Sequence, residues 1–142
     1  MSKTEYSGSC HCGSIGFIYQ TAIPPAGWSV RACQCSFCRA HDAWSTSDPD
    51  GALSFVAANP EDLQRYRFGY GTADFLICRR CGVYIGAAIE SPNGQFGIIN
   101  THALDSMPDD LAPGAPISYD GENTEGRSSR RGQRWTPVSA LP

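Results

Sequence analysis

Seven cysteines in three close groups constrain this chain more than any other feature. The groups read Cys10-His11-Cys12-Gly13, Cys33-Gln34-Cys35-Ser36-Phe37-Cys38 and Cys78-Arg79-Arg80-Cys81-Gly82. Two thiolates so close in sequence can bind one metal ion from a tight turn, and a following glycine permits the positive backbone angle that turns amide hydrogens toward the sulfurs. An odd number of cysteines in such groups favours metal binding over a disulfide framework.

The first and third groups, each a pair followed by glycine, form the candidate structural site. Cys10, Cys12, Cys78 and Cys81 supply four soft ligands, the closed tetrahedral set that structural zinc prefers. Each pair lies next to a predicted strand, so one ion would tie the first strand region to a later hairpin and add to stability. The spacing also allows Cys10 or Cys12 to join the middle group, which would leave one pair incomplete.

The middle group, Cys33, Cys35 and Cys38, supplies three thiolates. Three protein ligands leave one position of a tetrahedron for water or substrate, as in catalytic zinc sites. Zinc with three thiolates carries a net negative charge, so it should bind an incoming thiol more readily than it activates water for hydrolysis. A fourth protein ligand, from His41, His102 or an aspartate, would instead close this site and make it structural.

The overall composition is that of a single globular domain. The chain has 142 residues, which is enough to bury a core, and its net charge of -3 lacks the basic surplus of nucleic-acid-binding proteins. No apolar run approaches membrane-spanning length, and the first residues contain no signal-peptide core. We therefore expect a cytoplasmic protein whose thiols stay reduced and which binds neither nucleic acid nor membrane.

Alternating hydrophobic and polar residues predict a mostly β fold. Ile15, Phe17 and Tyr19 have the period-two spacing of a half-buried strand. Turns rich in proline, glycine, asparagine and aspartate separate the further candidates, which are 28–33, 53–57, 64–68, 73–77, 83–89 and 95–100. Many short strands at this spacing indicate an antiparallel sandwich or open barrel.

Helical structure is predicted at only two places. Residues 60–63 form one helical turn in this interpretation, with Asn59 as its cap. A short helix could also begin near Asn123, although Gly126 and Gly132 weaken that prediction.

The C-terminal segment differs from the rest in composition. Residues 107–116 are rich in proline and aspartate and indicate a loop, and residues 120–134 contain almost nothing apolar. Four arginines fall in this second stretch, namely Arg127, Arg130, Arg131 and Arg134. We interpret them as a solvated or acid-paired tail, and a lid over an anionic substrate is the alternative.

Taken in order, the cysteine motifs resemble one known family. They read Gly8-x-Cys10-x-Cys12-Gly13-x-Ile15-x-Phe17, then Cys33-x-Cys35-Ser36-x-Cys38-Arg39, then Cys78-x-x-Cys81-Gly82. Over about residues 6–104 the chain is similar to the glutathione-dependent formaldehyde-activating family, whose domain also occurs in centromere protein V. The Tyr66-Arg67-Phe68 segment fits this resemblance as well.

The resemblance implies an all-β, Mss4-like fold of packed antiparallel sheets with zinc knuckles in residues 6–104. A C-terminal extension of loop and helix, packed on that domain or trailing from it, would then occupy residues 105–142. The resemblance also implies two zinc ions per chain, one structural and one proposed to be catalytic. The first would bind Cys10, Cys12, Cys78 and Cys81, and the second, more easily lost, would bind Cys33, Cys35 and Cys38.

The activity implied by the resemblance is that of a carbon-sulfur lyase. In the founding enzymes, glutathione is thought to engage the second zinc and to react with formaldehyde to give S-hydroxymethylglutathione. A thiol such as glutathione is therefore the expected small-molecule partner. The region after Leu104 resembles only a subset of family members.

Four residues outside the cysteine groups are also candidates for a functional role. Arg39 follows the three-cysteine group and could bind a substrate carboxylate, and Arg31 shares a predicted strand face with Cys33. His41 and His102 are candidate proton carriers. Each of these side chains also has an ordinary alternative role as a surface or packed residue. Two other functions stay open: a zinc-stabilised binding module without catalysis, and a thiol redox protein that uses the Cys78-x-x-Cys81 pair.

Overall fold

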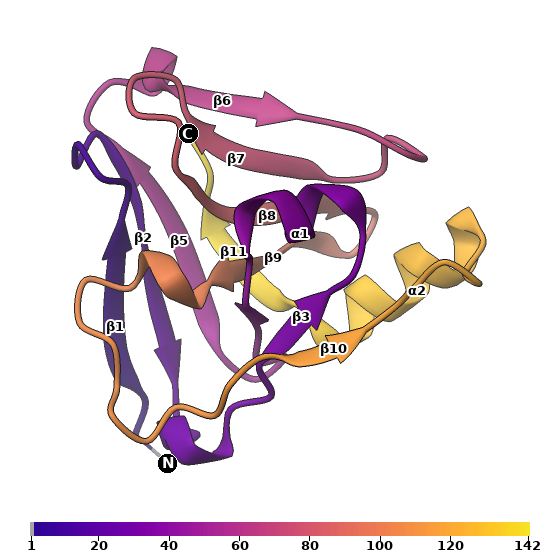
Figure 1. The fold of residues 1–142 in the computed structure, drawn as a ribbon, viewed down its shortest axis with the longest axis horizontal. Helices are drawn as coiled ribbons and strands as arrows, with labels where there is room; N and C mark the ends of the chain where they lie inside the picture. The colour runs from indigo at the N-terminus through magenta and orange to yellow at the C-terminus, as the bar shows by residue number, and fades with distance from the viewer. Residues whose placement is uncertain (1) are drawn as a thin grey trace.

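Two sheets make up most of the computed structural model, which describes residues 2–142 (Figure 1). The first sheet is antiparallel and contains β1 (Thr4–Ser9), β2 (Ile15–Thr21) and β5 (Ala52–Ala57). The second contains, in order, β6 (Leu63–Tyr66), β7 (Asp74–Cys78), β8 (Tyr84–Ser91), β9 (Gly94–Asn100), β4 (Ser45–Thr46), β3 (Arg31–Cys33) and β10 (Ala115–Ile117). The predicted all-β, Mss4-like architecture is confirmed.

The last strand, β11 (Thr136–Ala140), joins the two sheets. Its first residues pair antiparallel with β9, where Thr136 lies opposite Gly97, and its later residues pair parallel with β5, where Val138 lies opposite Leu53. The β3–β10 pair is parallel as well. The two sheets are therefore mixed rather than purely antiparallel, because the C-terminal segment adds one parallel partner to each.

The core confirms the alternation predicted for the first strands. Ile15, Phe17 and Tyr19 of β2 are each 1% exposed and pack against Leu53 and Phe55 of β5 in one apolar cluster. A second cluster surrounds Phe37 and contains apolar side chains from four other elements or their ends, namely Phe75, Tyr84, Ile98 and Trp135. This second cluster lies beneath the middle cysteine group and includes Cys38.

Short helices occur where the sequence places capping residues. The 3-10 turn η2 (Pro60–Asp62) is capped by Asn59, whose side chain accepts from the Glu61 amide at 3.2 Å. The helix α2 (Thr124–Arg134) is capped by Asn123, whose side chain accepts from the Gly126 amide at 2.7 Å. Both predicted helices are thus confirmed, as is the Asn59 cap, and the structure adds Asn123 as the cap of α2.

Three further helical segments were not predicted. They are α1 (Ser36–His41), η1 (Pro25–Gly27) and η3 (Thr101–Ala103). None of the helices in the described residues combines the length and hydropathy that crossing a membrane would require. Figure 1 shows α2 and β10 on the side of the molecule opposite β1 and β2.

Candidate metal centres and the adjoining cavity

The four-cysteine cluster joins two turns that are far apart in the sequence. Cys10 and Cys12 lie in the turn between β1 and β2, whereas Cys78 ends β7 and Cys81 lies in the turn to β8. Their sulfurs all lie within 4.8 Å of one another. The structure therefore brings together the four residues that the sequence assigned to one closed site.

The two turns of this cluster have the same local geometry. The Cys10 amide donates to the Ile15 carbonyl and the Cys78 amide to the Val83 carbonyl, each at 3.0 Å. Gly13 and Gly82 both have a φ of 82°, the left-handed conformation expected from the glycine after each pair. In each turn an amide also donates to the first cysteine's sulfur, from Ile15 at 3.4 Å and from Cys81 at 3.5 Å. The backbone thus presents donors to sulfurs that carry negative charge when bound to a metal.

The three-cysteine cluster comes from one continuous segment. Cys33 ends β3, Cys35 caps α1, and Cys38 lies in the first turn of α1, where its amide donates to the Cys35 sulfur at 3.3 Å. The three sulfurs lie within 4.8 Å of one another. The first turn of helix α1 places Cys38 next to Cys35. The cysteine spacing alone did not predict this helix.

The ionisation of each thiol in this cluster depends on the other two. Hydrogen bonds from Cys33 and Cys38 lower the pKa of the Cys35 thiol to about 2, and contacts with Cys33 and Cys35 raise the pKa of the Cys38 thiol far above its ordinary value. Three thiolates at this distance repel one another, so they cannot all ionise without a cation. A bound divalent metal would supply that cation and allow all three to act as thiolates.

Both sets of sulfurs fit a soft divalent cation. A tetrahedron with metal–sulfur bonds of about 2.3 Å has edges of about 3.8 Å. The sulfur–sulfur distances in the first cluster are close to this, 3.7 Å for Cys10–Cys12 and 3.6 Å for Cys12–Cys78. All seven cysteines are free thiols rather than disulfides. The two clusters could therefore each hold a metal ion.

A cavity of about 410 Å³ opens beside the three-cysteine cluster, and all three cysteines line it. This volume lies in the range typical of small-molecule sites. Five aromatic side chains form part of its wall, namely Phe68, Tyr70, Phe75, Tyr119 and Trp135. The charged part of the wall consists of one carboxylate, Asp120, and four arginines, Arg31, Arg127, Arg130 and Arg131. The cavity thus combines soft ligands, apolar surface and positive charge.

The arginines of α2 were interpreted as a solvated or acid-paired tail, and the structure corrects part of this. Arg130 is acid-paired, with Nε and Nη2 donating to Glu122 at 2.8 and 3.0 Å, and its guanidinium lies 3.6 Å from the centre of the Tyr119 ring. Arg127 also faces Glu122, at 3.6 Å. Arg131, in contrast, is only 7% exposed, so the solvated interpretation is wrong for this residue.

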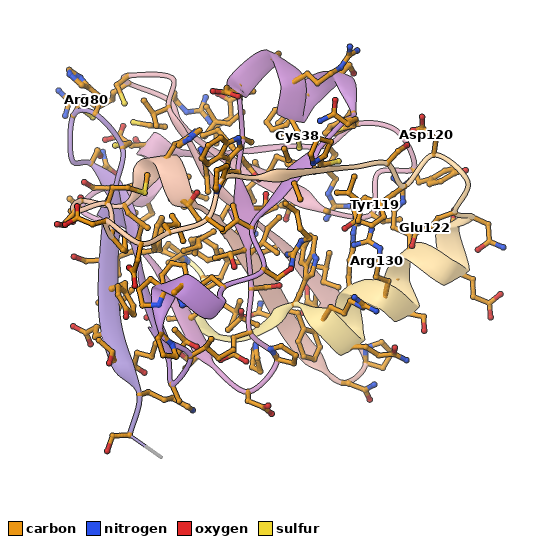
Figure 2. The ribbon with its side chains drawn as sticks, turned by 60° about the horizontal axis from the view of Figure 1, so that its bottom comes forward. Cys38, Arg80, Tyr119, Asp120, Glu122 and Arg130 are labelled. Atoms are coloured by element: carbon orange, nitrogen blue, oxygen red, sulfur yellow. The ribbon has the colours of Figure 1, made fainter. Side chains whose placement is uncertain are left out.

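Figure 2 shows how these groups are distributed over the molecule. Tyr119, Glu122 and Arg130 gather at the side where α2 lies, and Cys38 lies nearer the middle of the molecule. Arg80, from the turn between Cys78 and Cys81, lies at the opposite side. The two cysteine clusters are therefore separate sites in the protein.

Of the remaining candidate residues, Arg39, His41 and His102 lie outside the cavity. Arg39 is exposed on α1 and is not among the residues that line the cavity, whereas Arg31 does line it. The exposed His41 packs on Phe37, with ring centres 4.4 Å apart. The Nδ1 atom of His102 lies 2.7 Å from the Asp42 carbonyl oxygen. Among residues 2–142, no histidine or carboxylate joins Cys33, Cys35 and Cys38 in a common ligand group.

Comparison with known proteins assigns the chain to a family. The family described as glutathione-dependent formaldehyde-activating enzyme matches residues 5–120. The chain belongs to this family. Its two cysteine clusters both lie inside the matched segment, whereas α2 and β11 of this family member lie beyond it.

A solved structure supports the same fold. The chain is similar to the crystal structure of a Rhodobacter sphaeroides protein, a Northeast Structural Genomics target, with a TM-score of 0.58. The two are 28% identical, and the match covers 78% of this chain and 99% of that chain. No curated protein matches this member of the formaldehyde-activating family significantly.

Proposed function

We propose that this protein is a zinc-dependent enzyme of the carbon-sulfur lyase type that acts on a thiol adduct of a small aldehyde. The model reaction is the formation of S-hydroxymethylglutathione from glutathione and formaldehyde. One observation carries the proposal: three cysteines, to which residues 2–142 add no fourth ligand, line a cavity of about 410 Å³. The family to which the chain belongs supports it.

In the proposed reaction the thiol sulfur adds to the aldehyde carbon. The new carbon–sulfur bond forms as the carbonyl π bond breaks, and the thiol proton ends on the former carbonyl oxygen. Zinc, when bound by Cys33, Cys35 and Cys38, supplies the soft Lewis acid that holds a substrate sulfur as a thiolate.

The other residues of the cavity would bind and shield the substrate. Phe68, Phe75 and Trp135 exclude water from one side of the cavity, which strengthens electrostatic contacts inside it. The arginine side chains of the wall give the cavity a positive field that attracts an anionic thiol such as glutathione.

The decisive experiment compares turnover of glutathione and formaldehyde by the native protein and by Cys35→Ser. We expect the substitution to lower the rate about 100-fold or more, since metal sites lose 10–100-fold even from changes outside their direct ligands. Ser36→Ala is the matched control, because Ser36 is exposed next to Cys35 and is no ligand. Equal rates for the native protein and Cys35→Ser would contradict the proposal.

Two other functions predict different results, one in this turnover assay and one on treatment with a mild oxidant. A non-catalytic, zinc-stabilised binding module would bind metal and show no turnover with any thiol and aldehyde. A thiol redox protein would release its metal and form disulfides in mild oxidant. The absence of a fourth ligand for the middle cluster among the described residues favours the enzyme over the binding module.

A further inference from the structure

Arg131 is a buried guanidinium in the cavity wall with no carboxylate partner. It is 7% exposed, and Nη1 donates to the Thr72 hydroxyl at 2.8 Å. Its Nε is buried and has no hydrogen-bond partner in the described part of the chain. Its guanidinium also lies 5.0 Å from the centre of the Trp135 ring. Packing and one neutral hydroxyl thus hold the side chain in place, and within the described residues its guanidinium has no direct ion-pair partner.

A second arginine of the same cavity is in a similar position. Arg31 lies on β3, two residues before Cys33, and donates from Nη2 to the Ser47 hydroxyl at 2.9 Å. Ser47 in turn donates to the Arg134 carbonyl at 2.8 Å, which anchors the pair to the end of α2. Within residues 2–142, no carboxylate lies within 4.0 Å of either Arg31 or Arg131.

The nearby acidic groups do not neutralise these two arginines. Glu122 is already shared by Arg130 and Arg127. Asp120 lines the cavity but is exposed and forms no ion pair within the described residues. Burial, and then the charges of Arg130 and Arg127, lower the pKa of Arg131 to about 10, which still leaves it charged at neutral pH.

A buried charge without a partner costs free energy, and a bound anion removes that cost. A planar guanidinium suits a carboxylate, because its donors form parallel hydrogen bonds to the two oxygens. A metal ion on three thiolates would add one negative charge to the same cavity, but it offers no oxygen acceptor to the arginine donors.

We propose that Arg131, assisted by Arg31, forms an anion subsite that binds a carboxylate of the thiol ligand while the ligand's sulfur faces the three cysteines. This inference rests on the proposed function and specifies its substrate class, a thiol that carries a carboxylate. Arg131 lies beyond residues 5–120, so this part of the subsite comes from the segment outside the family match.

The test uses cobalt-loaded protein, in which a thiol that reaches the metal changes the visible absorption spectrum. The probes are ω-mercaptoalkanoates too long to chelate the ion, each compared with the mercaptoalcohol of equal chain length. At the best chain length, we expect native protein to bind the carboxylate at least about 10-fold more tightly than the alcohol. Arg131→Gln should remove most of this preference and Arg31→Gln a smaller part.

Arg134→Gln is the matched control, because it removes the same charge from an exposed position on the same helix and should keep the preference. Equal binding of both probes by native protein at every chain length would overturn the subsite without any variant. An undiminished preference in folded Arg131→Gln would overturn it as well. A spectrum that no thiol changes would instead contradict the proposed function, so the two failures are distinguishable.

Discussion

The two cysteine clusters use the same ligand atoms in opposite structural settings. Cys12 and Cys78 are 66 positions apart in the sequence, and their sulfurs are 3.6 Å apart across two turns that extend from different sheets. Cys33, Cys35 and Cys38 come from the end of one strand and the first turn of the next helix. A metal in the first cluster would cross-link the fold, whereas a metal in the second would link only neighbouring residues.

This difference suggests that the four-cysteine cluster serves stability and the three-cysteine cluster serves function. Loop-closure entropy makes a link between distant residues stabilising, and a link within six residues contributes little in this way. The local cluster offers three cysteine ligands and has a cavity beside it, so a metal ion bound there could exchange its remaining ligand. Substitutions and metal removal can test whether the four-cysteine site stabilises the fold and the three-cysteine site serves function.

The largest effect is expected at an exposed residue. Cys12 is exposed, and a surface substitution normally changes the free energy of unfolding by less than about 0.5 kcal/mol. Because Cys12 completes the cross-linking site, we expect Cys12→Ser to lower that free energy by about 4 kcal/mol or more, as loss of a structural metal does. Denaturant unfolding of the purified variants measures the change.

The neighbouring residue provides the control for this experiment. His11 is also exposed and lies in the same turn, so His11→Ser should change the free energy of unfolding by less than about 0.5 kcal/mol. Cys35→Ser should lower the free energy of unfolding by clearly less than Cys12→Ser does. A larger loss for Cys35→Ser would reverse the assignment of the two roles.

The order of metal release gives the next comparison. Titration with a competing chelator should remove one zinc ion at an affinity at least about 100-fold weaker than the other, because the three-cysteine site lacks one protein ligand. Metal analysis at each step, with Cys35→Ser and Cys12→Ser as references, identifies the site that empties first. A single release step for both ions would show that the clusters do not differ in affinity.

The sequence predicted the closed cluster better than it predicted the cavity. The paired cysteines, the following glycines and the alternation of β2 are all local patterns, and the structure confirms them. The parallel pairing of β11 with β5 joins residues far apart in the chain, and no local pattern encodes such a partner. The burial of Arg131 was not predicted for a similar reason, because its contacts with Thr72 and Trp135 form only when the chain folds.

A smaller effect is expected from the glycine of one cysteine turn. Gly82 has a φ of 82°, and a Cβ built there would contact nothing within 4 Å, so only the backbone conformation opposes a side chain. Gly82→Ala should therefore lower the free energy of unfolding by about 1–2 kcal/mol. Gly121→Ala is the control, because that position is equally open and has no positive φ. Equal stability of the two variants would contradict a strained turn beside the closed site.

The smallest effect concerns a hydroxyl beside the local cluster. Tyr84 is 2% exposed, and its hydroxyl has no hydrogen-bond partner within residues 2–142. Burial and the neighbouring thiols of Cys38, Cys35 and Cys33 raise the pKa of Tyr84 well above its ordinary value, so the hydroxyl stays neutral.

A buried hydroxyl without a partner costs free energy, and Tyr84→Phe removes it while keeping the ring contacts with Phe37 and Phe75. We therefore expect metal-free Tyr84→Phe to equal the native protein in unfolding free energy or to exceed it by up to about 1 kcal/mol. A loss of more than about 1 kcal/mol would contradict this expectation and would mean that the Tyr84 hydroxyl forms a hydrogen bond in solution.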